Sequence, residues 1–228
     1  MGEASTLRVI TCASSKGGVG KTTLATALAV KATQEKKRVA MVDLDPQASL
    51  ADWWKRRGRS ENPTIFTGAD KASEAIEKLE LTERPDYVFI DTPPAFLVVL
   101  QDAIESADLA IIPLKASALD LIASEDAVMM AREAGVAHLC VINDADARWK
   151  TTHSARDYLL AADVPVAGSI ITHRQPYLGA MSYGKTGPEI ERKKKGEAKS
   201  ATEAEIDALW AEVQRALAKA KRKEDAHG

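Results

Sequence analysis

The sequence has few of the residues that build cysteine-based sites. It contains two cysteines, Cys12 and Cys140, which lie far apart and each within an apolar run. Two isolated thiols do not by themselves supply the ligands of a zinc or iron–sulfur site, so both kinds of site are disfavoured. We therefore expect both cysteines to be buried structural residues.

The sequence also lacks long apolar runs and a strong net charge. No apolar run approaches the length needed to span a membrane, and the N-terminus has no basic-then-apolar signal pattern. The formal net charge is −2, so no overall field attracts the chain to nucleic acid or membranes, and such binding would need a local patch. Together with the free cysteines, these features predict a cytoplasmic protein.

What is present is an ordinary globular composition, with 45% hydrophobic and 28% charged residues. A length of 228 residues is enough for one large domain with a substantial core. We find no internal repeat and no linker, so we expect a single domain over residues 1–228.

Short apolar segments alternate with helix-forming segments along the chain. The predicted strands cover 7–13, 38–42, 64–66, 87–90, 109–113, 139–143 and 167–171. The predicted helices cover 21–34, 50–57, 71–79, 95–106, 118–134, 154–162 and 203–221, with a mostly irregular segment over 174–199 and a flexible tail over 222–228. This alternation is typical of an α/β fold with one doubly wound, mainly parallel sheet and helices on both faces.

A glycine-rich loop, Ser15–Thr23, lies between the first predicted strand and the first predicted helix. Its glycines allow the backbone to wrap an anion, and the start of a helix adds a partial positive charge. Lys21 is placed to reach the β- and γ-phosphates of a nucleotide, and the Thr22 hydroxyl to bind Mg²⁺. The residues expected to contact the nucleotide are Lys16, Gly17, Gly18, Val19, Gly20, Lys21, Thr22 and Thr23.

The loop departs from the common pattern G-x-x-x-x-G-K-[ST] in an informative way. Ser15 replaces the first glycine, and a second lysine, Lys16, stands near the front of the loop. From the residues alone, a second cation near a triphosphate helps to neutralise charge in the transition state. The stretch resembles the deviant Walker A loop of the ParA/MinD family of ATPases, especially small ParA-type partition ATPases. This resemblance covers about residues 7–190 and implies a P-loop NTPase fold in which Lys16 reaches the nucleotide of a second subunit.

Acidic residues follow two other predicted strands. Asp91 ends an apolar run and precedes a Pro-Pro pair, as a Walker B acid that contacts Mg²⁺ does. The sequence Asp43-Leu44-Asp45-Pro46-Gln47 is similar to the second acidic motif of ParA proteins. That resemblance implies that Asp45 positions the attacking water, with Asp43 nearer the magnesium shell or the loop lysines. We therefore expect catalytic roles for Lys16, Lys21 and Asp45, and magnesium contacts for Thr22, Asp45 and Asp91.

The sequence gives fewer signals for the residues that contact the adenine base than for those that contact the phosphates. Asn143 follows the predicted strand 139–143, and the resemblance implies that it contacts the adenine; a turn-forming asparagine is the alternative. The same resemblance makes Thr172, His173 and Arg174 candidates for closing over the base, although a lone histidine is more often a surface residue. The three motifs follow the predicted strands that end at Ala13, Val42 and Ile90, so they should meet at the carboxyl edge of one sheet.

Basic residues cluster late in the sequence. Six of them are candidate DNA contacts: Arg192, Lys193, Lys194, Lys195, Lys219 and Arg222. Such runs are as often simply solvated surface. ParA-like partition ATPases bind nucleoid DNA without sequence preference as ATP dimers, so the resemblance implies the same use here.

The closing helix carries an apolar stripe of Ile206, Leu209, Trp210, Val213 and Leu217. The stripe could lie on a membrane, as in the MinD branch, but the acidic residues beside it favour packing against the sheet.

Taken together, the resemblance implies a ParA-type ATPase for plasmid or chromosome partition. It would use ATP and Mg²⁺, form a homodimer with ATP, bind DNA non-specifically and have its hydrolysis stimulated by a ParB-like centromere-binding protein. It would associate with the nucleoid when ATP is bound and would not bind membranes. The alternatives are a MinD-like membrane positioning ATPase and a metabolic enzyme on the same scaffold.

Overall fold

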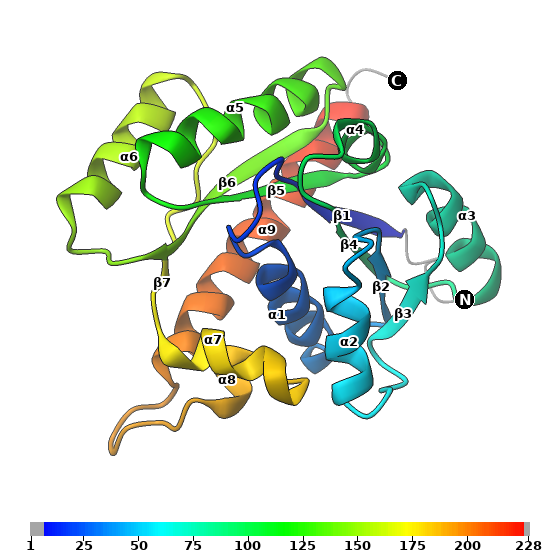
Figure 1. Ribbon diagram of the computed structural model, residues 1–228, viewed down its shortest axis with the longest axis horizontal. Coiled ribbons are helices and arrows are strands. Elements are labelled where there is room, and N and C mark those ends of the chain that lie inside the picture. Colours follow the sequence, from blue (N-terminus) through cyan, green and yellow to red (C-terminus); the bar gives the residue numbers. More distant parts are fainter. Residues whose placement is uncertain (1–6, 226–228) are drawn as a thin grey trace.

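The computed structural model describes residues 7–225 and is built around one parallel sheet (Figure 1). The seven strands run in the order β3-β2-β4-β1-β5-β6-β7, and every pair of neighbours is parallel. The strands are β1 (Arg8–Cys12), β2 (Val39–Asp43), β3 (Thr64–Thr67), β4 (Tyr87–Asp91), β5 (Leu109–Leu114), β6 (Ala137–Ala145) and β7 (Ile171–Thr172). The predicted α/β fold with a doubly wound parallel sheet is confirmed.

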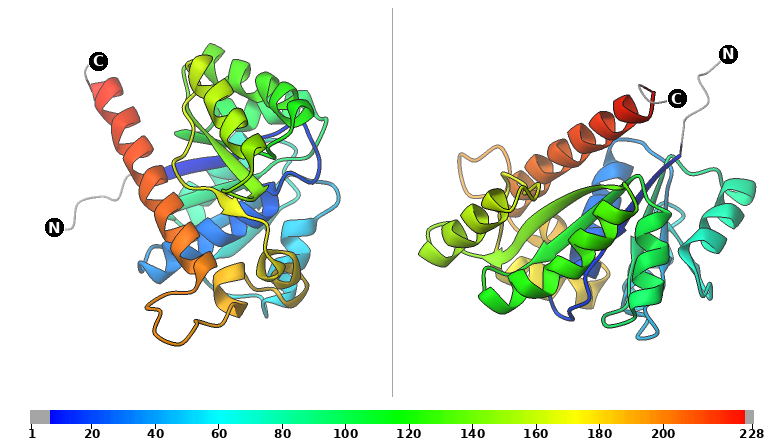
Figure 2. Two further views of the ribbon diagram at one scale, coloured as in Figure 1. Left: turned by 90° about the vertical axis from the view of Figure 1, so that its left-hand side faces the viewer. Right: turned by 90° about the horizontal axis from the view of Figure 1, so that it is seen from above.

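Helices cover both faces of the sheet (Figures 1 and 2). One face carries α1 (Lys21–Gln34), α2 (Ser49–Arg56) and α9 (Ala201–Asp225), with α7 (Gln175–Ala180), the 3₁₀ helix η1 (Met181–Tyr183) and α8 (Gly187–Ile190) beside them. The other face carries α3 (Ala72–Thr82), α4 (Leu97–Glu105), α5 (Ala118–Glu133) and α6 (Lys150–Ala161). Strand β1 lies between β4 and β5, so the loop that follows it emerges near the middle of the sheet.

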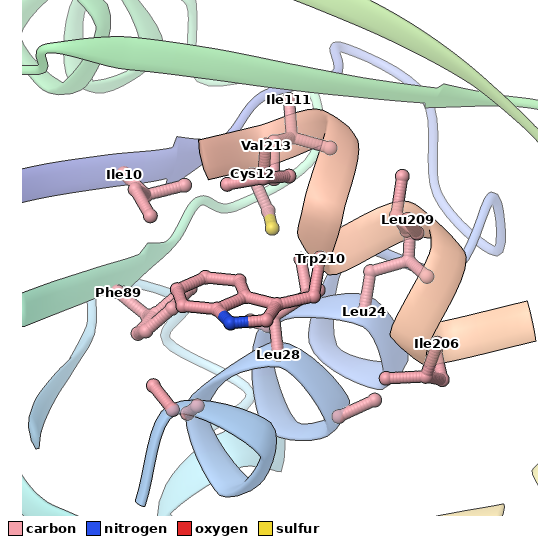
Figure 3. Packing of buried hydrophobic residues seen from close by; sticks show 14 of the residues in the cluster. Ile10, Cys12, Leu24, Leu28, Phe89, Ile111, Ile206, Leu209, Trp210 and Val213 are labelled. Carbon is pink, nitrogen blue, oxygen red and sulfur yellow. The ribbon is translucent and has the colours of Figure 1, made fainter. Parts of the chain in front are cut away.

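The closing helix α9 packs against the sheet, as its stripe predicts. Ile206, Leu209, Trp210, Val213 and Leu217 are all buried in the core that α9 shares with α1 and the strands. Figure 3 shows the Trp210 indole between α1 and the sheet, with ring centroids 5.3 Å from Tyr87 and 6.3 Å from Phe89. Burial of this stripe removes it from the surface that a membrane could reach.

The structure corrects several boundaries; for example, α6 begins at Lys150, four residues before the predicted helix 154–162. The predicted strand over 167–171 is wrong: the chain makes one isolated bridge at Val166 and pairs with β6 only at Ile171–Thr172. The closing helix predicted over 203–221 is longer, since α9 covers Ala201–Asp225; the flexibility of the tail over 222–228 stays a prediction, and 226–228 lie outside the described residues. The expectations for the cysteines and for 174–199 are confirmed, since both thiols are buried and the segment holds only short helices.

Within residues 7–225, no helix is both long enough and apolar enough to cross a membrane.

Candidate nucleotide site

The glycine-rich loop connects β1 to α1 at the carboxyl edge of the sheet (Figure 1). Two of its glycines adopt backbone conformations that other residues resist, with φ of 72° at Gly18 and 99° at Gly20. The ammonium of Lys21 donates a hydrogen bond to the carbonyl oxygen of Lys16 at 2.9 Å. A cavity of about 310 Å³ lies over the loop, lined by Gly17, Gly18, Gly20, Lys21, Thr22, Thr23, Asp45, Ser49 and Pro94. The loop, the acidic loop after β2 and the Pro-Pro turn after β4 therefore meet at one cavity.

Asn143 supports the loop through its side chain. Its side-chain nitrogen donates to the carbonyl oxygen of Val19 at 2.6 Å, and a Cβ added at Gly20 would lie 2.1 Å from that nitrogen. Only glycine fits this contact, because both the positive φ and the close approach exclude a side chain. The structure thus assigns the amide of Asn143 to the loop, and its contact with adenine stays a prediction.

Asp91 and Thr22 form the part of the site suited to a divalent cation. The Thr22 hydroxyl donates to one carboxylate oxygen of Asp91 at 2.6 Å. The other oxygen of Asp91 is buried and has no hydrogen-bond partner among the described residues. A buried oxygen without a partner is costly in a chain with nothing bound, and it is a ligand type that Mg²⁺ prefers. The pair therefore fits a magnesium ion that would also be held by phosphate oxygens and water.

The charges of this region are poorly solvated. Burial raises the pKa of Asp91 to about 7, against the opposing effects of the Thr22 hydrogen bond and of Lys21. Burial also lowers the pKa of Lys21, although Asp91 and Asp45 act in the other direction. Burial destabilises the charged forms of the Asp91 carboxyl and the Lys21 ammonium, so each form is stabilised by a partner of opposite charge. Mg²⁺ bound to a triphosphate would supply a positive partner for the carboxylate and negative partners for the ammonium.

No group of three or more histidine, cysteine, aspartate or glutamate residues able to hold a metal is present in the described part of the chain. A magnesium ion that shares its coordination with phosphates and water does not require such a group.

Asp43 and Asp45 have different surroundings. Both oxygens of Asp43 accept backbone hydrogen bonds, from the Asp45 amide at 3.1 Å and from the Ala51 amide at 2.8 Å. Asp45 is half-buried, lines the cavity and accepts from the Gln47 amide at 2.9 Å. Asp43 thus organises the loop and the start of α2, and its implied place near the magnesium shell or the loop lysines stays a prediction. Asp45 is the acid of this pair that lines the cavity.

The second lysine of the loop is paired within its own chain. The Lys16 ammonium lies 2.6 Å from a carboxylate oxygen of Asp120, whose side chain is 6% exposed. Asp120 lies in the first turn of α5, where the Ser117 hydroxyl contacts its other oxygen. The Ser15 hydroxyl donates to the carbonyl oxygen of Ala123 in the same helix, so α5 holds the front of the loop. The reach of Lys16 to a second subunit stays a prediction.

Asp120 is a residue that sequence reasoning missed. The only local signal was a serine three residues before an aspartate at a helix start, which is typical of helix capping. Nothing in that pattern indicates contact with a loop far earlier in the chain.

The three candidates for the base lie beside Asn143, because β7 pairs with the end of β6. His173 contacts Asp144 at 2.5 Å, and the Arg174 guanidinium donates to Glu205 of α9 at 3.0 Å. The Thr172 amide donates to the same glutamate at 3.3 Å. These contacts fix the segment over the edge of the sheet, and its use for the base stays a prediction.

Comparison with known proteins decides the family. A sequence model of the CobQ/CobB/MinD/ParA nucleotide-binding domain matches residues 10–185, which is more than half of the chain. The chain belongs to this family. The ParA/MinD resemblance of the loop is therefore confirmed, and the site is that of a nucleotide-binding domain.

Relatives within the ParA/MinD family include proteins named for the maintenance of carboxysome distribution. The chain is 29% identical over 179 residues to the maintenance of carboxysome distribution protein A of Halothiobacillus neapolitanus, covering 74% of this chain and 81% of the relative. It is 38% identical over 147 residues to the protein of that name from Gloeobacter kilaueensis, covering 62% and 65%. A ParA protein of Rhizobium radiobacter is 32% identical over 112 residues, covering 49% and 50%.

Solved structures of the family share the fold. MinD of Pyrococcus horikoshii, solved with Mg-ADP, superposes with a TM-score of 0.70 at 22% identity, covering 91% of this chain and 96% of that one. The ATP complex of a Cyanothece McdA variant gives 0.66 at 21% identity, covering 94% and 97%. This likeness shows that the chain has their fold, while the assignment of ATP and Mg²⁺ as cofactors follows from membership of the nucleotide-binding family.

The six candidate DNA contacts of this ParA/MinD chain do not form one patch. Arg192–Lys195 lie in the loop between α8 and α9, where all four side chains are exposed. Lys219 and Arg222 are exposed near the other end of α9. Lys219 lies about 27 Å along the helix from its start, at 1.5 Å per residue, and Figure 2 shows the two regions at opposite ends of the molecule.

Proposed function

We propose that this chain is a magnesium-dependent ATPase that positions a cellular cargo by forming an ATP-bound dimer on DNA. The observation that carries the proposal is the Thr22–Asp91 pair, whose second buried carboxylate oxygen lies beside a phosphate-binding loop. Family membership supports the nucleotide, and the relatives that position carboxysomes or partition DNA support the cellular task.

One residue or pair of residues is assigned to each step of the proposed reaction. The loop amides and Lys21 would bind the phosphates, and Thr22 and Asp91 would hold the magnesium ion, which neutralises phosphate charge when bound. Asp45 would orient the attacking water, since it is the carboxylate at the cavity that is not fully used by backbone hydrogen bonds. Lys16 would leave Asp120 and reach the nucleotide of the second copy in the dimer.

We extend the expected cargo from plasmids and chromosomes to intracellular bodies in general. The relatives include carboxysome distribution proteins as well as ParA proteins, and their common element is positioning. Association with the nucleoid and a ParB-like or equivalent activator that stimulates hydrolysis remain part of this proposal.

The proposal is tested by measuring the mass of the purified protein in solution with ADP and with ATP, with and without duplex DNA. We expect a monomer with ADP, a dimer with ATP and co-elution of the dimer with DNA, together with slow release of phosphate. The Lys21→Ala variant is the matched control and should stay monomeric under every condition. A monomer that neither hydrolyses ATP nor binds duplex DNA would refute the proposal.

Two alternatives are separated by related measurements. Flotation with liposomes that depends on ATP would favour a MinD-like role, which burial of the α9 stripe counts against. Turnover that requires a small-molecule acceptor would favour a metabolic enzyme on this scaffold.

A further inference from the structure

A group of cations on one side of the molecule makes no ion pair within the described chain. Arg56 and Arg59 lie at the end of α2, Lys185 lies between η1 and α8, and Arg192, Lys194 and Lys195 lie in the loop before α9. All six of these residues are exposed. Among the described residues, none of their side chains makes a hydrogen bond or an ion pair. We call this group the α2–α8 basic face.

The segments of the face are fixed to one another. The Arg57 guanidinium donates to both carboxylate oxygens of Glu189, at 2.9 and 2.8 Å, and to the carbonyl oxygen of Gly184 at 3.1 Å. It also lies 5.1 Å from the centre of the Trp53 ring, and the Trp53 indole donates to the carbonyl oxygen of Lys185 at 2.9 Å. These contacts place the end of α2 directly against the segment that leads into α8.

The approach is close enough to require glycine. A Cβ added at Gly184 would lie 2.1 Å from the backbone nitrogen of Arg57, and Gly184 has a φ of 62°. Arg57 and Glu189 neutralise each other's charge. The exposed cations around this pair therefore keep their charge available to a ligand from solution.

The loop of Arg192–Lys195 continues the same surface. It begins three residues after Glu189, which α2 contacts through Arg57. Just before this loop, the Glu191 carboxylate accepts from the Thr202 amide at 2.7 Å, and within it Lys193 donates to the carbonyl oxygen of Ala198 at 2.9 Å. In Figure 1, α2, α8 and this loop lie in the lower part of the view.

The face differs in charge from the rest of the chain. Residues 52–61 and 183–195 together contain nine basic and four acidic side chains, a net charge of +5 in a chain whose total is −2. Positive charge concentrated in this way attracts a polyanion through the release of its counterions. The residues outside these two segments carry a net charge of −7, the difference between −2 and +5, so a polyanion is attracted mainly to this side.

We infer that the α2–α8 basic face binds the phosphate backbone of duplex DNA, without reading its sequence. This inference rests on the proposed function and assigns its DNA-contacting surface. The cations are spread over three segments. This arrangement fits the repeated phosphates of a DNA duplex better than it fits a short acidic peptide. The exposed Tyr183, 69% accessible beside these cations, can add contact with a sugar or phosphate.

The face is also connected to the nucleotide cavity. α2 begins at Ser49, which lines the cavity, and ends at Arg56 in the face. This helix spans about 12 Å, at 1.5 Å per residue. A change in the acidic loop on nucleotide binding would therefore be transmitted to the face by one short helix.

The test compares two triple variants of the full-length protein that remove the same charge. Arg56→Gln/Arg59→Gln/Lys185→Gln alters the face, and Lys219→Gln/Lys221→Gln/Arg222→Gln alters the far end of α9. Binding of a fluorescent duplex is measured with ATP over a series of salt concentrations, after thermal unfolding has shown that both variants are folded. We expect the face variant to lose at least about 30-fold in affinity at about 0.1 M salt.

The slope of log affinity against log salt should also fall by about 2.7 in the face variant, at roughly 0.9 for each phosphate contact removed. The far-end variant should keep the wild-type affinity within about threefold. Equal DNA affinity of the face variant and the wild type would overturn the inference and leave the proposed function intact. A wild-type protein with ATP that binds no duplex would instead overturn the proposed function. Loss of binding to phosphatidylglycerol vesicles with unchanged DNA affinity would assign the face to lipid and overturn the inference.

Discussion

The buried carboxyl of Asp91 should make the protein less stable as the pH rises. Its folded-state pKa of about 7 lies above the ordinary value of 3.8. Between these two values the folded chain binds more protons than the unfolded chain, so the free energy of unfolding falls with increasing pH. Replacing Asp91 by Asn removes the charge while keeping an acceptor for the Thr22 hydroxyl.

The size of the effect follows from the pKa difference. A difference of about 3 units corresponds to about 4 kcal/mol at pH values above about 7, because one unit is about 1.4 kcal/mol. The interval from about pH 5 to pH 7 covers about 2 pH units between the unfolded and folded pKa values. Over that interval the stability gained by Asp91→Asn should grow by about 3 kcal/mol.

The assay is urea unfolding of wild type and Asp91→Asn at about pH 5, 6, 7 and 8, without nucleotide or divalent cations. The variant should be the more stable protein, and its advantage should increase up to about pH 7 and then stay constant. Adding Mg²⁺ and ATP should reverse the order at about pH 8, since the wild type alone keeps the carboxylate ligand. A difference between the two proteins that does not change with pH would show that Asp91 is ionised throughout, and the reasoning would fail.

Three further substitutions test single roles. Lys21→Ala should lower ATP affinity at least about 100-fold by removing a phosphate-binding cation, as measured by fluorescent-nucleotide titration; unchanged affinity would remove Lys21 from the site. Asp45→Ala should bind ATP normally but release phosphate at least about 100-fold more slowly, and normal turnover would contradict its role with water. Asp120→Asn should free Lys16 from its ion pair, so sedimentation should show the ATP dimer at a lower protein concentration. An unchanged dimer dissociation constant would show that this ion pair does not compete with dimerisation.

The parts of the site that the sequence predicts are those encoded locally. The Ser15–Thr23 loop and the acid of Asp91 each follow an apolar strand, and parallel strands bring their carboxyl ends to one edge. The same reasoning predicts the sheet and the helix α1 with its observed limits. These features need only the order of elements and the spacing of residues within them.

The parts that the sequence does not predict depend on contacts between distant segments. Asp120 meets Lys16 only because α5 lies beside the loop, and Glu205 meets Arg174 only because α9 crosses the sheet. The segment before β7 shows a related limit, since Ala167 is buried in the core without belonging to a strand. Apolar character predicts burial there but does not distinguish a paired strand from a buried connection.

The end of α9 was missed for a different reason. The run after Lys219 is strongly charged, yet lysine, arginine and glutamate are good helix formers, and α9 continues past residue 221. High charge therefore predicts exposure at that position and not the end of a helix.

The two backbone hydrogen bonds accepted by Asp43 have a consequence for the speed of the cycle. They hold the loop of Asp45 by contacts within residues 43–51. The conformation of the loop is therefore maintained by hydrogen bonds within this segment. Under the proposed function, slow turnover would then arise from steps between molecules, in which a second copy or an activator completes the cavity. To raise the rate of ATP hydrolysis, substitutions should accordingly be made on the outer surfaces of the protein, and residues 43–51 should be left unchanged.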